Sequence, residues 1–152
     1  MNRAAITSNE ALQLDHQLCF ALYSASLAMT KLYKPLLDEL ELTYPQYLAL
    51  LALWEKDGLT VSELGQRLFL DSGTLTPLLK RLEENGLVLR ERSSADERVV
   101  DISLTPAGRA LRQKCAAIPG QLFERLGYSA GDADKLKKQL DRLLTLLQAA
   151  AD

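Results

Sequence analysis

Cysteine is the most reactive residue type in this sequence, and each of its two cysteines is a candidate for thiol chemistry. Cys19 lies in a helical pattern, and the phenol of Tyr23 follows four residues later on the same helix face. The thiolate is the nucleophilic form of cysteine, and it attacks electrophilic oxygen such as that of a peroxide. A phenol O–H group favours the thiolate by donating a hydrogen bond to it. These residues alone favour an inert buried thiol, which is the commoner fate of a cysteine on an apolar helix.

A second set of polar groups follows one short helical pattern and has the chemistry of nucleic-acid recognition. From Thr74 to about Asn85, leucines recur at helical spacing and predict one buried face. A cap at Ser72 or Gly73 would begin this helix, and Asn85-Gly86 would end it. Hydroxyls and cations suited to phosphates and base edges occupy its other face and its start: Ser72, Thr74, Thr76, Lys80 and Arg81.

Two strand patterns come next and are joined by a polar tip. The first runs from Leu87 to Arg92, the second from Arg98 to Leu104, and the tip from Ser93 to Glu97. We expect Asp96 to hold the guanidinium of Arg98 so that it points outward. The basic residues of this hairpin are expected to contact DNA: Arg90, Arg92 and Arg98.

The remaining elements must position these groups. Helical patterns cover Ser8 to Leu40, Pro45 to about Glu55, Val61 to Leu68, Thr105 to Cys115 or beyond, and Ala130 to Ala150. Pro35 predicts a kink or local break in the first, and Pro119-Gly120 predicts a kink in or the end of the fourth. We therefore predict a mainly α fold with a small β-wing, a winged helix-turn-helix whose second helix lies in the major groove.

We expect one domain over residues 1–152. Residues 44–105 would form the winged helix-turn-helix, and residues 1–43 and 106–152 would supply dimerisation helices. The terminal helices have more apolar surface than the DNA-binding segment can cover, and groove readers commonly bind inverted half-sites as twofold dimers. Two alternatives stay open: the long helices cover each other within one subunit, or the chain is a small α+β core whose charges merely face water.

The composition limits the function classes. The 152 residues are 47% hydrophobic and 25% charged, which suits one globular domain. A net charge of −2 argues against an indiscriminate nucleic-acid binder. The sequence has neither a signal-peptide pattern nor a long apolar run, so we expect a cytoplasmic protein with free thiols. With one histidine and two distant cysteines we expect no metal, and without a Gly-rich phosphate loop we expect no cofactor.

Several motifs resemble the MarR family of winged-helix regulators. Asp96-Glu97-Arg98 followed by Leu104-Thr105-Pro106-Ala107-Gly108 is that family's usual mark. More specific are Leu18-Cys19-Phe20-Ala21-Leu22-Tyr23, Leu42-Thr43-Tyr44-Pro45-Gln46-Tyr47 and the segment from Leu70 to Arg81. Together these motifs resemble the organic-hydroperoxide-sensing branch of the family, the OhrR-like repressors, and the match extends from about Leu14 to Leu147.

The resemblance implies a homodimeric repressor whose first and last helices form the dimer interface. In this branch an organic hydroperoxide oxidises a cysteine near the start of the first helix, and the inverted-repeat operator DNA is released. The match carries that role onto Cys19, and it implies that Tyr33 and Tyr44 hydrogen-bond the thiolate, with Tyr23 nearby. Tyr33 and Tyr44 are too distant in sequence to contact Cys19 by helix spacing, so they would reach it across the fold or from the partner subunit.

Cys115 is a possible resolving cysteine, because some members of this branch form an intersubunit disulfide. In those members we would expect the second cysteine near residues 121–124, and this chain has none there. If Cys115 does not resolve, a small cellular thiol would form a mixed disulfide with Cys19.

Two other function classes compete with this interpretation. A cysteine peroxidase commonly uses a βαβ scaffold, whereas the strands predicted here are confined to the wing, so we expect no enzyme. A MarR-type repressor released by non-covalent binding of a phenolic or other small ligand would share the same fold.

Overall fold

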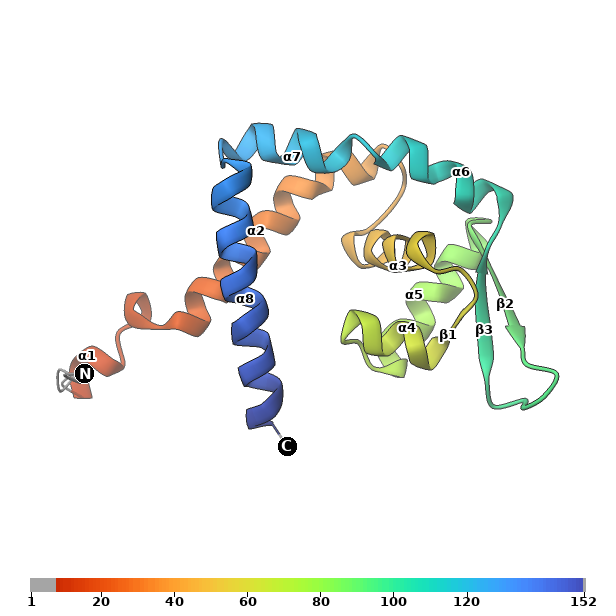
Figure 1. The fold of residues 1–152 in the computed structure, drawn as a ribbon, viewed down its shortest axis with the longest axis horizontal. Helices are drawn as coiled ribbons and strands as arrows, with labels where there is room; N and C mark the ends of the chain where they lie inside the picture. The colour runs from red at the N-terminus through yellow and green to blue at the C-terminus, as the bar shows by residue number, and fades with distance from the viewer. Residues whose placement is uncertain (1–7, 152) are drawn as a thin grey trace. The chain divides into compact units, whose positions relative to one another are not determined.

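The computed structural model of the chain describes residues 8–151 (Figure 1). The elements follow in the order α1 (Ser8–Ala11), a 3₁₀ helix (Leu14–His16), α2 (Leu18–Asp38), α3 (Tyr44–Glu55), β1 (Leu59–Thr60), α4 (Val61–Leu68), α5 (Ser72–Glu84), β2 (Val88–Arg92), β3 (Val100–Leu104), α6 (Pro106–Cys115), α7 (Ile118–Leu126) and α8 (Ala130–Ala150). They form two compact units that divide between Ala110 and Leu111. The predicted fold class, mainly α with a small β-wing, is confirmed.

The first predicted helix is divided in the structure. The pattern from Ser8 to Leu40 predicted one continuous helix, but α1, the 3₁₀ helix and α2 replace it. Gln17 has an extended backbone at the start of α2. Its side-chain amide donates to the carbonyl oxygens of Ala11 and Gln13 at 2.6 and 3.1 Å. These bonds satisfy carbonyls that a continuous helix would have paired with backbone N–H groups, and they turn the chain.

Local signals determine where α2 ends and where α3 begins. Pro35 lies inside α2, which continues to Asp38, so the predicted local break is absent. Leu37 is 1% exposed and anchors the last turn in the core. Thr43 caps α3 in a capping box with Gln46, in which the two residues exchange bonds of 3.0 and 3.3 Å. As a result, α3 starts one residue before its predicted start.

Both short helices of the helix-turn-helix are present, and the second begins at Ser72, two residues before its predicted start. Asp71, rather than Ser72 or Gly73, caps α5, because its carboxylate accepts the backbone N–H of Thr74 at 2.8 Å. This hydrogen bond lowers the pKa of Asp71 because it stabilises the carboxylate. A negative cap also suits the positive end of the helix dipole.

The end of α5 confirms the predicted stop at Asn85-Gly86. Gly86 has a φ of +74°, a conformation that glycine adopts without strain. Its N–H donates to the carbonyl of Glu83 at 2.9 Å, and the N–H of Leu87 donates to the carbonyl of Leu82 at 3.0 Å. This pair of bonds is a Schellman motif, and it delivers the chain directly into β2.

The sheet is larger than the predicted hairpin because β1 adds to it. β1 and β2 both pair antiparallel with β3, which gives the order β1-β3-β2. Strands were predicted only in the wing, and that prediction is wrong at β1, where two residues are too few to show a strand pattern. Ile102 of β3 lies opposite Leu59 and Arg90 and is fully buried. It anchors a hairpin whose far end extends away from α4 and α5 (Figure 1).

The core of the first unit is built from leucines of the helices and apolar residues of the sheet. Its fully buried large side chains are Leu37, Leu50, Leu53, Leu64, Leu75, Leu79, Leu82, Val88 and Ile102. Burial of each such side chain contributes about 1.5–3 kcal/mol before conformational entropy is counted. The same leucines that periodicity placed on one face of α5 therefore attach that helix to α3 and α4.

The second unit differs from the prediction at Pro119. Pro119-Gly120 was expected to kink or end a helix, but α6 ends at Cys115 and Pro119 lies in the first turn of α7. A proline suits that position because the first N–H groups of a helix have no intrahelical acceptor. The last helix, α8, has its predicted bounds.

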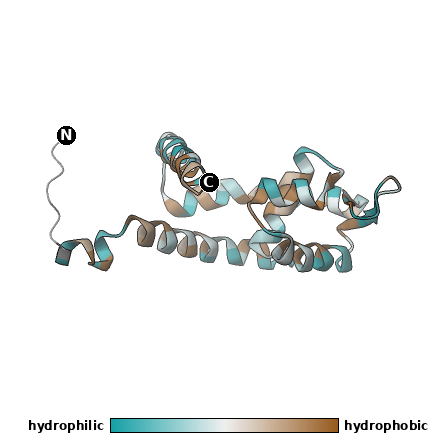
Figure 2. Ribbon diagram, turned by 90° about the horizontal axis from the view of Figure 1, so that it is seen from below, coloured by the Kyte–Doolittle hydropathy of each residue, from teal (hydrophilic) through white to brown (hydrophobic). Residues whose placement is uncertain are grey.

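The leucine stripe of α8 stays exposed. Leu136, Leu140 and Leu144 are 43%, 39% and 38% exposed. Figure 2 shows hydrophobic positions recurring along α2 as well. Among residues 8–151, none of the helices combines the length and the apolar character that spanning a membrane requires.

Candidate functional site

The polar face of α5 lies opposite its buried leucines. Leu75, Leu79 and Leu82 are fully buried. The side chains predicted to meet DNA are all exposed: Ser72, Thr74, Thr76, Lys80 and Arg81. α5 therefore has the arrangement of a recognition helix, with one face in the core and hydroxyls and cations on the other.

A groove of about 950 Å³ lies between α4, α5 and the β2–β3 hairpin. Its polar and charged lining comes from both sides: Ser62 and Gln66 of α4, Ser72 and Thr76 of α5, and Arg90, Arg92 and Arg98 of the hairpin. Neutral donors facing cations suit a sugar–phosphate backbone. Cations thus gather along this groove although the net charge of the chain is −2.

The tip of the hairpin presents Arg98. This residue lies in the loop rather than in a strand as predicted, because β3 begins at Val100. Asp96 accepts the backbone N–H of Arg98 at 3.0 Å and its guanidinium Nε and Nη2 at 3.2 Å each. The Arg98 side chain holds the pKa of Asp96 below its ordinary value and is itself 90% exposed. Arg92 braces the tip by donating from Nη1 to the carbonyl of Glu97 at 2.8 Å.

Arg90 has a different environment from the other predicted wing cations. Glu83, in the last turns of α5, accepts the backbone N–H of Arg90 at 3.1 Å and its guanidinium at 3.2 and 3.3 Å. The Arg90 side chain is only 28% exposed. This clamp fastens β2 to α5 and leaves Arg90 fewer donors for DNA. Sequence reasoning missed Glu83, because a carboxylate seven residues before an arginine matches neither helix nor strand spacing.

Cys19 is the second residue of α2 and is an exposed free thiol. Tyr23 follows one turn later and is 63% exposed. The cap residue Gln17 makes no side-chain bond to the first turn of α2, since its amide points back along the chain. Cys19 is therefore accessible to a solute, unlike the inert buried thiol that its apolar helix alone would favour.

Tyr33 and Tyr44 lie together at the other end of α2. Their ring centroids are 4.8 Å apart, and Tyr47 lies 5.9 Å from Tyr33. Burial, with the neighbouring Tyr44 and Tyr47, raises the pKa of Tyr33 to about 12, and burial raises the pKa of Tyr44. Both phenols therefore stay protonated at neutral pH. Within the described part of the chain, neither hydroxyl has a hydrogen-bond partner.

One subunit does not bring the thiol and these phenols together. Cys19 and Tyr33 lie on the same unbroken helix, and at about 1.5 Å per residue their separation along it is about 21 Å. Tyr44 is in contact with Tyr33 and is therefore just as remote. Of the two routes left open by the sequence, contact across one fold and contact from a partner subunit, this geometry supports the second.

Cys115 is a different kind of thiol. It ends α6 and is 3% exposed. Burial raises its pKa, because desolvation disfavours the thiolate. Both properties oppose a resolving role, which requires an accessible thiolate.

An exposed polar helix face, an adjoining wing with an outward arginine and a buried helical core together define a winged helix-turn-helix transcriptional regulator. The family described as transcriptional regulator SarA/Rot matches residues 31–115. The chain is 55% identical over 137 residues to the organic hydroperoxide resistance transcriptional regulator of Bacillus subtilis (strain 168), with 90% of this chain and 91% of that protein covered.

Solved structures agree with this class. Reduced AbfR bound to DNA matches with a TM-score of 0.82 and 36% identity, covering 94% of this chain and 98% of that one. Overoxidised AbfR bound to DNA matches with a TM-score of 0.76 and 36% identity, covering 91% and 97%. AbfR comes from Staphylococcus epidermidis.

The chain belongs to the MarR family of winged helix-turn-helix transcriptional regulators and, within it, to the organic hydroperoxide resistance regulators. The resemblance inferred from the sequence motifs and the predicted function class, a redox-sensing transcriptional repressor, are thereby confirmed.

Proposed function

We propose that this chain works as a homodimer that holds an inverted-repeat operator while Cys19 is reduced and releases it when an organic hydroperoxide oxidises Cys19. The observation that carries the proposal is the separation along α2: an accessible thiol lies at one end, and at the other lie two protonated phenols whose hydroxyls have no hydrogen-bond partner among residues 8–151. A twofold arrangement that places the start of one α2 against the end of its partner's would supply Cys19 with both donors.

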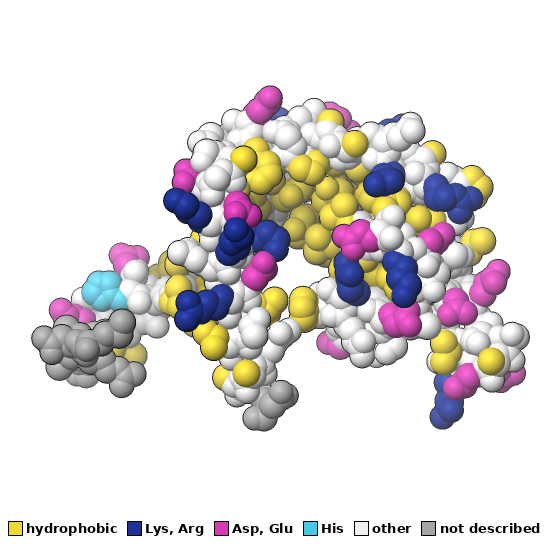
Figure 3. Space-filling view, in the orientation of Figure 1, with side chains coloured by type: hydrophobic (Ala, Val, Ile, Leu, Met, Phe, Trp, Pro, Cys, Tyr) yellow, Lys and Arg dark blue, Asp and Glu magenta, His cyan; other side chains and the backbone are white. Residues whose placement is uncertain are grey.

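Exposed apolar surface supports the dimer. Along α2 and the turn before it, large hydrophobic side chains remain exposed in the single chain: Leu14, Leu18, Phe20, Tyr23, Leu27 and Met29. Figure 3 shows hydrophobic side chains interspersed with charged ones along α8. A second copy would cover these faces, since contiguous apolar patches on soluble proteins commonly mark interaction sites. Residues 1–43 and 106–152 are the proposed dimerisation segments around the DNA-binding region, 44–105.

The proposed reaction begins with the Cys19 thiolate. Its sulfur attacks the terminal oxygen of the hydroperoxide, the O–O bond breaks, and the alkoxide leaves and is protonated to an alcohol. Cys19 becomes a sulfenic acid, which condenses with a small cellular thiol to a mixed disulfide and water. Tyr33 and Tyr44 of the partner subunit would favour the thiolate by donating to it, with Tyr23 of the same helix nearby. The buried Cys115 supports this one-cysteine route over an internal disulfide.

On DNA, α5 would lie in a major groove with Ser72, Thr74, Thr76, Lys80 and Arg81 facing base edges and phosphates. The hairpin would follow the adjoining backbone or minor groove, with Arg98 as its outermost contact and Arg92 and Arg90 behind it. The peroxide is consumed once per thiol as a signal, so the protein is not an enzyme. It needs no cofactor, and it acts in the cytoplasm where its operator lies.

Cys19→Ser tests the proposal directly. The hydroxyl nearly matches the thiol in volume, so the fold and operator binding should persist, whereas release by cumene hydroperoxide should disappear because serine forms no sulfenic acid. The measurement is operator binding by fluorescence anisotropy before and after peroxide treatment. If the variant still releases DNA on treatment, redox sensing at Cys19 is wrong, and a repressor released by a non-covalently bound phenolic or other small ligand becomes the better account.

A further inference from the structure

The motif Leu104-Thr105-Pro106-Ala107-Gly108 takes no part in the thiol chemistry or the DNA contacts described above. In the structure it joins the end of the wing to the end of the recognition helix. The backbone N–H of Thr105 donates to the carbonyl of Leu87 at 3.0 Å. The Thr105 hydroxyl donates to the carbonyl of Gly86 at 2.6 Å and accepts the N–H of Gly108 at 3.0 Å. One threonine thus ties the turn after α5 to the first turn of α6.

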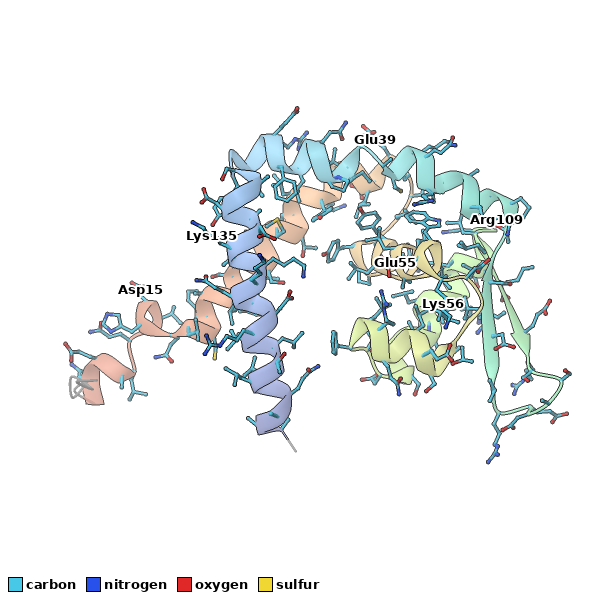
Figure 4. All side chains as sticks on the ribbon, in the orientation of Figure 1. Asp15, Glu39, Glu55, Lys56, Arg109 and Lys135 are labelled. Atoms are coloured by element: carbon cyan, nitrogen blue, oxygen red, sulfur yellow. The ribbon has the colours of Figure 1, made fainter. Side chains whose placement is uncertain are left out.

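Gly108 makes this connection tight. A Cβ at that position would lie 2.1 Å from the carbonyl oxygen of Leu87, far inside van der Waals contact. The first turn of α6 therefore lies directly against the backbone of the turn between α5 and β2. Arg109, labelled in Figure 4, adds a bond of 3.0 Å from its guanidinium to the carbonyl of Leu104. Backbone packed against backbone leaves no side chain to absorb a displacement, so we call residues 104–109 and the turn at 86–87 the joint.

The C-terminal end of α3 is bonded to the joint at two points. The indole Nε1 of Trp54 donates to the carbonyl of Gly108 at 2.9 Å. Asp57, just after α3, accepts the N–H of Leu104 at 2.9 Å through Oδ1. The first bond joins residues that are 54 positions apart in the sequence, and the second joins residues that are 47 positions apart. They attach α3 to both the start of α6 and the end of β3.

The other end of α3 carries the tyrosine pair. Tyr44 is the first residue of the helix, and Trp54 lies about 15 Å further along it. Between them, Ala49, Leu50 and Leu53 are fully buried. A helix packed on its core face at this density moves as a body rather than by bending, because close-packed interiors transmit displacement.

We propose that Trp54 and Asp57 are positioning residues that couple the tyrosine pair to the joint. When Cys19 is oxidised and the phenol of Tyr44 loses its thiolate acceptor, a shift of α3 reaches Gly108 and Leu104 through these two bonds and changes how the wing is held beside α5. This inference rests on the proposed function, since it concerns how oxidation at Cys19 reaches the DNA-binding surface.

The experiment uses Trp54→Phe and Asp57→Ala in the full chain. Trp54→Phe removes the indole donor and keeps an aromatic ring, and Asp57→Ala removes the acceptor at an exposed position. Cys19 oxidation is measured by thiol labelling, and operator affinity by fluorescence anisotropy before and after cumene hydroperoxide. Both variants should oxidise at the native rate and bind operator when reduced. The ratio of oxidised to reduced Kd should be about tenfold smaller than in the native protein.

Arg67→Gln is the matched control. Arg67 pairs with Glu55 at the same end of α3, but this pair is exposed and leads to α4 rather than to the joint. The ratio of oxidised to reduced Kd for Arg67→Gln should equal that of the native protein. Coupling through the joint is wrong if Trp54→Phe and Asp57→Ala release operator as the native protein does. It is also wrong if they weaken reduced and oxidised binding equally, which is the result of a merely structural role.

Trp54 also reports on the joint directly, because it is the one tryptophan of the sequence. Its fluorescence emission should shift when native protein is oxidised and stay constant in peroxide-treated Cys19→Ser. An unchanged native emission with full operator release would overturn the coupling and leave the proposed function intact. If the native protein keeps its operator after Cys19 oxidation, the proposed function itself fails.

Discussion

The separation of about 21 Å along α2 between Cys19 and Tyr33 leads to a prediction about which subunit supports the thiolate. If Tyr33 acts on its partner's cysteine, removing the phenol from one subunit should slow the oxidation of Cys19 in the other. Mixed dimers of two differently tagged chains separate the two cases. In the first mixed dimer one chain carries Cys19→Ser and the other Tyr33→Phe. The surviving Cys19 and the surviving Tyr33 are then on different chains.

The second mixed dimer is the matched control. One chain is native, and the other carries both Cys19→Ser and Tyr33→Phe, so the surviving Cys19 and Tyr33 share one chain. Each mixed dimer has the same composition and differs only in how the two changes are distributed. If Tyr33 supports the thiolate of its partner subunit, Cys19 of the first mixed dimer should be oxidised at the native rate and Cys19 of the second should be oxidised slowly. Action within one subunit predicts the reverse.

The size of the effect follows from the lost donor. A hydrogen bond to a charged group contributes about 1.5–3 kcal/mol, so its loss lowers the thiolate population roughly tenfold to a hundredfold at neutral pH. The remaining thiolate is a better nucleophile, with a Brønsted coefficient of about 0.4–0.5, which offsets part of that loss. The net slowing should be about threefold to tenfold.

The assay is the rate of Cys19 sulfenic acid formation with cumene hydroperoxide, followed by a trapping reagent and mass spectrometry. Purification through both tags, repeated after the reaction, establishes that subunits have not exchanged. Equal rates in the two mixed dimers would show that Tyr33 does not support the thiolate at all. Slow oxidation of Cys19 in the first mixed dimer, together with native-rate oxidation in the second, would refute the inference drawn from the geometry of α2.

Three further predictions concern the wing, the dimer and the tyrosine pair. Arg98→Ala should weaken operator binding about tenfold. If Arg98 contacts a phosphate, the change should also reduce the slope of log affinity against log salt concentration by about 1. Unchanged affinity at moderate salt would show that Arg98 does not contact the DNA. Leu144→Glu should dissociate or unfold the protein in sedimentation analysis, whereas Leu146→Glu, on the opposite face of α8, should not. The folded pKa of Tyr33, about 12, lies above the ordinary value of 10.0, so its contribution to stability is complete below pH 10 and is lost as pH rises towards 12. Native Tm should therefore fall more steeply over that range than the Tm of Tyr33→Phe, and parallel curves would contradict this assignment.

Elements with strong local signals were predictable from the sequence. α4 and α8 have their predicted bounds, whereas α5 begins at Ser72, two residues before its predicted start, because Asp71 caps it. In each, leucines at helical spacing define the buried stripe, and residues within three or four positions define the ends. The division before α2 was not predictable in this way. It depends on the Gln17 side chain reaching carbonyls four and six residues back, and a glutamine inside a helical pattern gives no sign of that.

Site residues were predictable to the extent that their chemistry is visible in residue type. The polar face of α5 and the Asp96–Arg98 pair depend on spacings of a few residues, and the structure contains both. The clamp of Glu83 on Arg90 and the bonds of Trp54 and Asp57 to the joint were not predicted. Each joins groups from different elements, and their meeting depends on how α5, β2, α3 and α6 pack.

By itself, the sequence determined the family, the recognition helix, the wing and the candidate thiol, because each is encoded by residue types within a short stretch. Only the tertiary structure decided that Cys19 is exposed, that Cys115 is buried, and that Tyr33 and Tyr44 adjoin each other remote from Cys19. Exposure and proximity are properties of packed surfaces. The same apolar spacing that predicts a helix leaves open whether its face meets its own core or stays uncovered, and α2 and α8 keep much of theirs uncovered.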